Sequence, residues 1–183
     1  MEPKIVFQGQ TKTGKKVIIR YPTMDDLLPM LNFINTISVE QTFVRPQGEQ
    51  FTLEQEEDYL KDQLEKIEAK KVVKLIAFID GKFVGTADIF MKAQVESHVG
   101  VFGIIVANGY RSEGIGRLLM ENVIKESLKE MPQLRIVELS VFANNPLALD
   151  FYKKMGFIEF GRLPEGVLHR GQYVDHIYMY KKL

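Results

Sequence analysis

The stretch VGVFGIIVANGYRSEGIGRLL, residues 99–119, joins an apolar strand to an Asn-Gly turn and a glycine-rich helix start. The first backbone N–H groups of a helix lack partners and lie at the positive end of the helix dipole, so anions bind there readily. Gly114 and Gly116 would let a phosphate come close to the main chain. Residues 111–116 therefore predict a pyrophosphate-binding loop, although a short glycine pattern alone is equally compatible with a turn that packs a helix against a strand.

Two other nucleotide-binding motifs fit these residues poorly. A P-loop needs Gly-Lys-Ser/Thr, and Gly14-Lys15-Lys16 has neither the hydroxyl residue nor an evident apolar strand before it. A dinucleotide fingerprint needs a third glycine where this chain has Leu119, and an acid at the end of the next strand, whereas Glu138 falls in mid-strand. A dinucleotide-binding protein remains a weaker alternative.

The segments before this stretch predict strands and helices in alternation. A β-branched run over 16–21 predicts a strand, and the acids after Thr23 predict a helix start that extends to about residue 40. A polar loop over 45–50 precedes a second helix over 52–70, for which Thr52-Leu-Glu-Gln is the start signal. The expected buried face of that helix consists of Leu53, Tyr59, Leu60, Leu64 and Ile67.

From residue 72 the spacing of apolar residues changes to that of β-strands. Residues 72–79 and 83–91 flank Asp80-Gly81, which is a strong hairpin signal. Gly100 and Gly103 inside the strand over 99–106 favour a β-bulge there. The remaining expected elements are a helix over 114–130, a strand over 135–142, a helix over 145–155 and strands over 157–162 and 173–180. We predict one α/β domain over residues 1–183, with a mixed, mostly antiparallel sheet flanked by helices.

A second block, residues 141–157, carries the other notable pattern. Asn145 is suited to capping the helix that it begins, and Gly156 to ending it. Leu147, Phe151 and Met155 lie four residues apart and are expected to form its buried stripe. Considered alone, Tyr152 would be a partly buried aromatic side chain with its hydroxyl at the rim.

Together the two blocks resemble the GCN5-related N-acetyltransferase (GNAT) superfamily. Arg111-x-x-Gly114-x-Gly116 is similar to the acetyl-CoA signature of these enzymes, and Asn145-x-x-Ala148-x-x-x-Tyr152-x-x-x-Gly156 is similar to their second conserved block. The resemblance is close over residues 99–160. It implies a splayed pair of parallel strands, 99–106 and 135–142, with acetyl-CoA in the opening.

The resemblance also implies site residues. The main chain of Ile104, Ile105 and Val106 would bind the pantetheine arm, and Asn145 would contact the cofactor. The pyrophosphate would lie on the helix start, formed by Arg111, Ser112, Glu113, Gly114, Ile115, Gly116 and Arg117. Tyr152 would lie near the sulfur, where a phenol that stays protonated at neutral pH could protonate the leaving thiolate as a general acid.

Transfer to an amine also requires a group that removes a proton from the ammonium form. Many members of the superfamily carry an acidic residue on the strand that corresponds to residues 99–106. This chain has no acidic residue there. Glu96, His98 and Glu138 remain open as bases acting through a water. Since the chain has no cysteine and no evident Ser/His/Asp order, we expect direct transfer without an acetyl-enzyme.

Composition excludes several classes of protein. Lys+Arg and Asp+Glu both number 24, so no net field attracts nucleic acid or an anionic membrane surface. Cysteine is absent and the three histidines are scattered, so we expect no metal site. No apolar run approaches the ~20 residues that a spanning helix needs. We expect a cytoplasmic protein, and the sequence leaves a homodimer open.

The expected acceptor is a small primary amine such as a free amino acid. The segment Gly171-Gln-Tyr-Val-Asp175 resembles that of bacterial small-amine acetyltransferases, and Asp175 could meet an ammonium group. Arg162, Arg170 or His169 could then meet a carboxylate. Two alternatives stay open: N-terminal acetylation of a ribosomal or other protein, and a non-catalytic acyl-CoA-binding module.

Overall fold

The computed structural model describes residues 3–11, 13–111 and 113–183. Its strands, in chain order, are β1 (Ile5–Gln10), β2 (Lys16–Arg20), β3 (Val72–Ile79), β4 (Lys82–Met91), β5 (Val99–Val106), β6 (Ile136–Phe142), β7 (Ile158–His169) and β8 (Gln172–Lys182). The helices are α1 (Leu27–Val39), α2 (Leu53–Glu68), α3 (Ile115–Glu130) and α4 (Pro146–Lys154), with 3-10 turns η1 (Met24–Asp26) and η2 (Gln94–Glu96).

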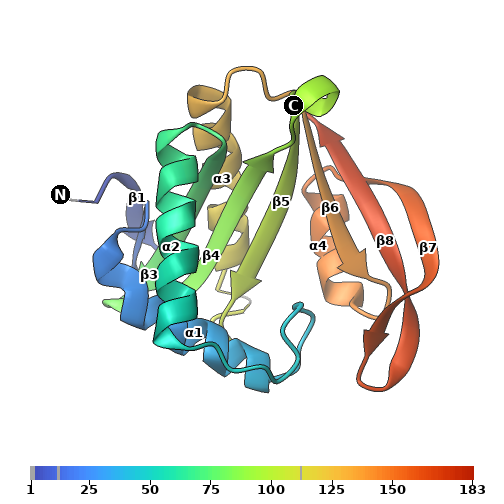
Figure 1. The fold of residues 1–183 in the computed structure, drawn as a ribbon, viewed down its shortest axis with the longest axis horizontal. Coiled ribbons are helices and arrows are strands. Elements are labelled where there is room, and N and C mark those ends of the chain that lie inside the picture. Colours follow the sequence, from blue (N-terminus) through green and yellow to red (C-terminus); the bar gives the residue numbers. More distant parts are fainter. Residues whose placement is uncertain (1–2, 12, 112) are drawn as a thin grey trace.

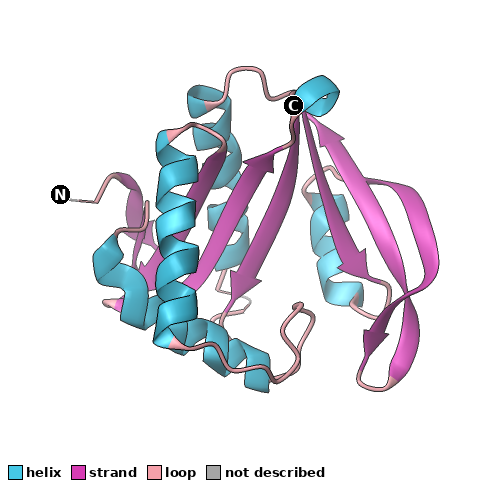
Figure 2. Cartoon of the chain, in the orientation of Figure 1, coloured by secondary structure: helices cyan, strands magenta, loops and turns pink. Residues whose placement is uncertain are grey.

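The strands form one mixed sheet in the order β1-β2-β3-β4-β5-β6-β8-β7, as Figures 1 and 2 show. All neighbouring pairs are antiparallel except β5 and β6, which are parallel. Helices α1 and α2 lie on one face, and α3 and α4 lie on the other (Figure 1). The predicted mixed sheet, flanked by helices and containing one parallel pair, is confirmed.

The main core lies between α3 and the first half of the sheet. Leu119, Met120 and Val123 of α3 are fully buried in one cluster with Leu75 of β3 and Ala87 of β4. Burying a side chain of this size stabilises the fold by about 1.5–3 kcal/mol. Because α3 is anchored along its length, the loop that precedes it has a fixed position beside β5.

The parallel pair β5–β6 is short. Only Val99, Gly100 and Val101 of β5 have partners on β6. From Phe102 onward β5 pairs with β4 alone, while β6 pairs with β8 along its whole length. The strands therefore separate beyond residue 101, and the expected splayed pair is confirmed.

An aromatic cluster lies where the pairing stops. The ring of Phe102 is 6.4 Å from that of Tyr152 on α4 and 6.4 Å from that of Phe157, and the last two rings are 6.0 Å apart. Phe157 is buried in the short link between α4 and β7. These three rings fill the narrow end of the opening and help to keep the strands apart.

Several details differ from expectation. The bulge predicted in β5 is wrong, since its register with β4 is unbroken over seven pairs. The two glycines instead make room for neighbours: a Cβ at Gly100 would lie 2.5 Å from Ile89, and one at Gly103 would lie 2.9 Å from Asp88. Strand β1 was not predicted, and β7 extends to His169 through an irregularity between Leu163 and Val167.

The helix faces are also corrected. The capping box at Thr52 and Gln55 is confirmed, but Leu53 and Tyr59 are exposed, whereas Glu56 and Gln63 are buried with Leu60. On α4, Leu147 is 85% exposed, although Phe151 and Met155 pack against the core. Periodicity alone cannot identify a polar side chain that tertiary contacts bury, which is why the face of α2 was misplaced.

Candidate active site

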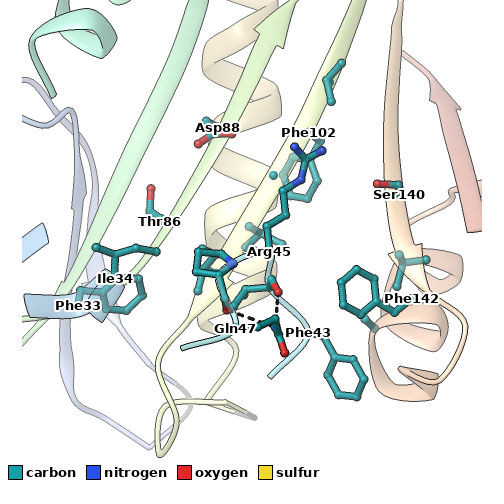
Figure 3. Close-up of a pocket in the computed structure, with 18 of the residues that line it drawn as sticks. Phe33, Ile34, Phe43, Arg45, Gln47, Thr86, Asp88, Phe102, Ser140 and Phe142 are labelled. Carbon is teal, nitrogen blue, oxygen red and sulfur yellow. Dashed lines mark hydrogen bonds between the residues drawn. The ribbon is translucent and has the colours of Figure 1, made fainter. Parts of the chain in front are cut away.

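A cavity of about 1170 Å³ occupies the opening between β5 and β6 and extends beneath α1 and α2. Its walls near the opening come from Phe102–Ile105 of β5, from Ser140–Phe142 of β6, and from Asn145, Ala148 and Tyr152. Its far wall comes from α1, α2, β3 and β4. Figure 3 shows the space between the two sets of side chains, with Asp88 on one side and Ser140 on the other.

The unpaired edge of β5 supplies main-chain groups to the cavity. Ile104 and Ile105 line it, and a Cβ built at Gly116 would touch the side chains of Ile104 and Val106. Beyond Val101 no strand of the described part of the chain pairs with this edge, so β5 can bond an extended ligand as it would bond another strand. This is the geometry expected for a pantetheine arm, whose amides can replace strand partners.

The glycine-rich loop ends in the start of α3, where backbone N–H groups lack partners within the helix. Gly114 is the N-cap of α3 and has a φ of 87°, in the left-handed region that favours glycine. Ser112 lies outside the described residues. Ile115 is 1% exposed, so its side chain anchors the helix start in the core and only its main chain can face a ligand. The helix start therefore presents N–H groups from a firmly held position.

Gly116 has a different role from Gly114. A Cβ there would meet only the side chains of Ile104, Phe151 and Val106, at ordinary distances of 3.8–4.0 Å. The protein itself does not require glycine at this position. The neighbours of this Cβ position come from β5 and α4, the two elements on either side of the opening.

Charged side chains of the loop hold it in place. Glu113 forms an ion pair with Lys15 at 2.9 Å and accepts a hydrogen bond from the Thr13 hydroxyl. These two partners lower the pKa of the Glu113 carboxyl, Thr13 being the larger cause. Arg111 donates from Nε to the Val106 carbonyl at 3.1 Å. Arg117 pairs with Glu121 on the exposed side of α3.

Asn145 and Tyr152 lie on the opposite wall. The Asn145 side chain accepts a hydrogen bond from the Ala148 N–H at 3.2 Å, so it caps α4 as expected while it lines the cavity. Burial raises the pKa of the Tyr152 phenol to about 12. A phenol with this pKa stays protonated near neutral pH and can donate a proton.

Several candidate residues from the sequence lie elsewhere. Asp175 pairs with Arg162 at 3.2 Å and accepts a hydrogen bond from the Glu165 N–H, within the β7–β8 hairpin. Glu96 and Glu138 both pair with Lys92. These residues and the exposed His98 do not line the cavity, so their expected parts in proton transfer or ammonium binding find no support.

His169 and Arg170 attach a loop rather than bind an acceptor. His169 is 2% exposed, and its Nε2 lies 3.1 Å from the Thr42 carbonyl while its Nδ1 lies 3.1 Å from the Asn144 amide. Arg170 donates to the Gln41 carbonyl at 3.1 Å. Together they fix the segment after α1 to the β7–β8 hairpin, across the wide end of the opening.

A polar cluster that the sequence did not reveal lies at the far wall. Lys74 is 2% exposed, and its Nζ lies 2.7 Å from Asp88 Oδ2 and 2.9 Å from the Tyr59 hydroxyl. Burial favours the neutral amine, but the charges and hydrogen bonds of Asp88 and Tyr59 prevail and raise the pKa of Lys74. Lys74, Asp88 and Gly103 are direct neighbours across β3, β4 and β5, so Asp88 lies beside the opening.

Glu56 completes this cluster. It is 6% exposed, lines the cavity from α2, and has its pKa raised by burial, with Lys74 opposing the rise. A carboxylate of raised pKa is a stronger base than an exposed one. Charged residues inside the apolar runs 72–79 and 83–91 were the available signal for this cluster.

The sequence and fold match known proteins. The model of the Acetyltransferase (GNAT) family matches residues 36–157, which is more than half of the chain. The chain belongs to the GNAT acetyltransferase family. It is therefore an acetyltransferase that uses acetyl-CoA, as the two sequence blocks implied.

Individual relatives agree with this assignment. The chain is 36% identical over 110 residues to the L-amino acid N-acetyltransferase AaaT of Escherichia coli strain K12, covering 59% of this chain and 67% of that protein. It is 33% identical over 79 residues to the spermidine N(1)-acetyltransferase of Vibrio cholerae, covering 43% of this chain and 45% of that protein. The match thus spans less than half of the second relative.

A solved GNAT acetyltransferase from Streptococcus pneumoniae has a similar fold. It superposes with a TM-score of 0.82 at 27% identity, over 91% of this chain and 99% of that one. Among the described residues, no cluster of three His, Asp or Glu side chains is suited to a metal ion. No helix in the described part of the chain is long and apolar enough to cross a membrane.

Proposed function

We propose that this GNAT enzyme transfers the acetyl group of acetyl-CoA directly to a small primary amine bound at the far wall of the cavity. The observation that carries the proposal is the continuity of the cavity. One space connects the unpaired edge of β5 and Tyr152 with the acids Glu56 and Asp88. A donor in the opening and an amine near the acids would therefore meet inside it.

The residues support a complete route for the protons. An alkylammonium group has a pKa near ~10.4, so it must lose a proton before its nitrogen can attack. Asp88 has one carboxylate oxygen bonded to Lys74, and its other oxygen faces Gly103 and can attract the ammonium. Glu56, whose pKa burial raises, takes the proton directly or through a water.

The remaining steps fall to the wall that holds the donor. The amine nitrogen forms a bond to the thioester carbon, and main-chain N–H groups on the unpaired edge of β5 stabilise the resulting oxyanion. The carbon–sulfur bond then breaks, and the Tyr152 hydroxyl gives its proton to the departing thiolate. No covalent intermediate on the protein is needed.

The cofactor residues predicted from the sequence keep these roles as part of the proposal. The helix start at 113–116 would bind the pyrophosphate, with Arg111 near it, and Asn145 would contact the donor from α4. Arg117 points to Glu121, so its contribution is a general positive charge near the loop.

A panel of acceptors tests the proposal. The protein would be incubated with acetyl-CoA and, separately, free amino acids, polyamines and peptides with free N-termini, while thiol release is followed. We expect turnover of small amines above the rate of hydrolysis. Turnover of a peptide with none of any small amine would refute the proposed acceptor class and favour protein N-terminal acetylation.

A further inference from the structure

The loop between α1 and α2 carries a cation toward the cavity. Arg45 lines the cavity, and in the view of Figure 3 its side chain extends from the loop across β5 toward Phe102. The loop around it is well held. The side-chain amide of Gln47 donates to the carbonyls of Thr42 and Val44 at 2.9 and 2.6 Å, and His169 bonds the same Thr42 carbonyl.

Arg45 differs from the other basic groups of the cavity. Lys74 is paired with Asp88 and hydrogen-bonded to Tyr59. Burial and the neighbouring Arg45 lower the pKa of His176, so that ring is uncharged near neutral pH. Among the described residues, Arg45 has no acid within ion-pair distance. It is thus a guanidinium available to a ligand.

The cavity is therefore lined by two groups of opposite charge that form no ion pair among the described residues. Lys74 forms its ion pair with Asp88 and acts on Glu56 only through its charge, which leaves an exposed Arg45 and a buried Glu56 without an ion-pair partner of their own among the described residues. A guanidinium binds a carboxylate through two parallel hydrogen bonds. A carboxylate attracts an ammonium group. An acceptor that carries both groups would satisfy the two side chains at once.

The rest of the acceptor wall is apolar. Phe33 of α1 and Phe83 of β4 form an edge-to-face pair with ring centroids 4.7 Å apart, and both line the cavity with Phe43 and Phe51. Such rings favour a large apolar group rather than the charged chain of a polyamine.

We propose that Arg45 binds the carboxylate of the acceptor, and that the acceptor is an α-amino acid with a large apolar side chain. The inference rests on the proposed acetylation of small amines and names the class within it. When Arg45 binds the carboxylate, the amino nitrogen of the acceptor lies near Glu56 and Asp88. The side chain of the acceptor then lies among the phenylalanines of the cavity. An amine without the carboxylate leaves Arg45 unpaired and is a poorer substrate.

The test compares acids with their amides. Acetylation of L-phenylalanine, L-leucine, their carboxamides and spermidine would be measured with wild-type protein, Arg45→Gln, Arg45→Lys and Arg162→Gln. We expect the wild type to prefer acid over amide, and Arg45→Gln to lose about 10- to 100-fold in kcat/KM on the acids only. Arg45→Lys should retain part of the preference. Arg162→Gln removes the same group from outside the cavity and should leave the acid-to-amide ratio unchanged.

Three outcomes would overturn the inference. Equal losses on acids and amides in Arg45→Gln, or a wild-type preference for spermidine, would refute carboxylate recognition and leave amine acetylation standing. Absence of turnover with every small amine would refute both proposals. Acetyl-CoA affinity, measured by calorimetry, should be the same in Arg45→Gln and wild type, which confirms that the variant is folded.

Discussion

The two walls of the cavity are built in different ways. The proposed donor wall consists of the cavity-lining residues 102–105 and of Asn145, Ala148 and Tyr152, beside the glycine-rich start of α3, with Tyr152 as the proposed reactive side chain. The acceptor wall uses the side chains of Arg45, Glu56, Lys74 and Asp88, which come from four separate segments. A shared donor can be bound by backbone geometry, whereas a particular acceptor must be selected by side chains.

The largest expected effect is on the acceptor wall. Glu56→Gln removes the proposed base, and we expect kcat to fall about 10³-fold, within the range typical of general bases. Because burial raises the pKa of Glu56, wild-type activity should be lost on acidification at a pH above that of an ordinary carboxyl. The variant should lack this acidic limb. Steady-state kinetics between pH 5 and 9 provide the measurement.

A matched control lies one residue away. Glu57→Gln makes the same chemical change at a side chain that pairs with Lys61 at the surface of α2. Its rate should be close to that of wild type. If Glu56→Gln retained both its rate and its acidic limb, another group would have to be the base.

A smaller effect is expected from the reactive side chain of the donor wall. Tyr152→Phe keeps the ring beside Phe102 and Phe157 but removes the hydroxyl. We expect kcat to fall about 10²-fold while the acetyl-CoA dissociation constant stays nearly unchanged. Wild-type turnover in this variant would assign Tyr152 to packing alone.

The main-chain part of the donor wall can be tested by comparing two glycines. A Cβ at Gly116 would contact its neighbours at ordinary distances, and the added methyl groups of Val would occupy space beside the helix start where we propose that the donor binds. We expect acetyl-CoA affinity to fall about 10- to 100-fold, as for the loss of a charge-assisted hydrogen bond or two, with little change in the melting temperature.

Gly114→Val provides the contrast. The φ of 87° at this position is unfavourable for a β-branched residue, so this variant should also lose about 1–2 kcal/mol of folding stability. Calorimetry with acetyl-CoA and thermal unfolding separate the two effects. An unchanged dissociation constant in a folded Gly116→Val protein would move the donor away from this loop.

The smallest expected effect concerns the stability of the acceptor wall. Because the folded-state pKa of Glu56 is raised, its contribution to stability is present below the unfolded pKa and is lost as pH rises through the folded pKa. Glu56→Gln should therefore unfold at a higher temperature than wild type near pH 7.5. The difference should shrink toward pH 4. A variant less stable than wild type at pH 7.5 would mean that ionised Glu56 is stabilised by its surroundings, chiefly by Lys74.

The donor wall was largely predictable from the sequence, because its parts are local. The helix start at Gly114, Asn145 as the cap of α4 and the splayed parallel pair all follow from spacing and resemblance, whereas the left-handed φ of Gly114 comes from the structure. The roles of these residues toward acetyl-CoA stay predictions until they are measured. Misjudged details, such as the exposed Leu147 and the unbroken register of β5, concern packing that periodicity does not specify.

The acceptor wall was not predictable in the same way. Lys74 and Asp88 stand out as charges inside apolar strands, but Arg45 and Glu56, considered alone, resemble ordinary surface residues of a loop and a helix, and nothing local links the four. Asp175, Arg162, Arg170 and His169 looked equally suitable, yet they stabilise the β7–β8 hairpin and attach the 41–47 loop.

The sequence alone determined the family, the order of most elements and the backbone signals for acetyl-CoA, because each depends on residues close together in the chain. The tertiary structure alone decided which charges share the cavity. Beside the Asp80-Gly81 turn, Ile79 of β3 pairs with Lys82 of β4, and this register, if continued, would place Lys74 opposite Ala87. An irregularity between Ala77 and Phe78 shifts the register by one residue, so Lys74 pairs with Asp88 instead. A one-residue shift reverses which face a strand side chain occupies, and that choice depends on packing against α2 and β5.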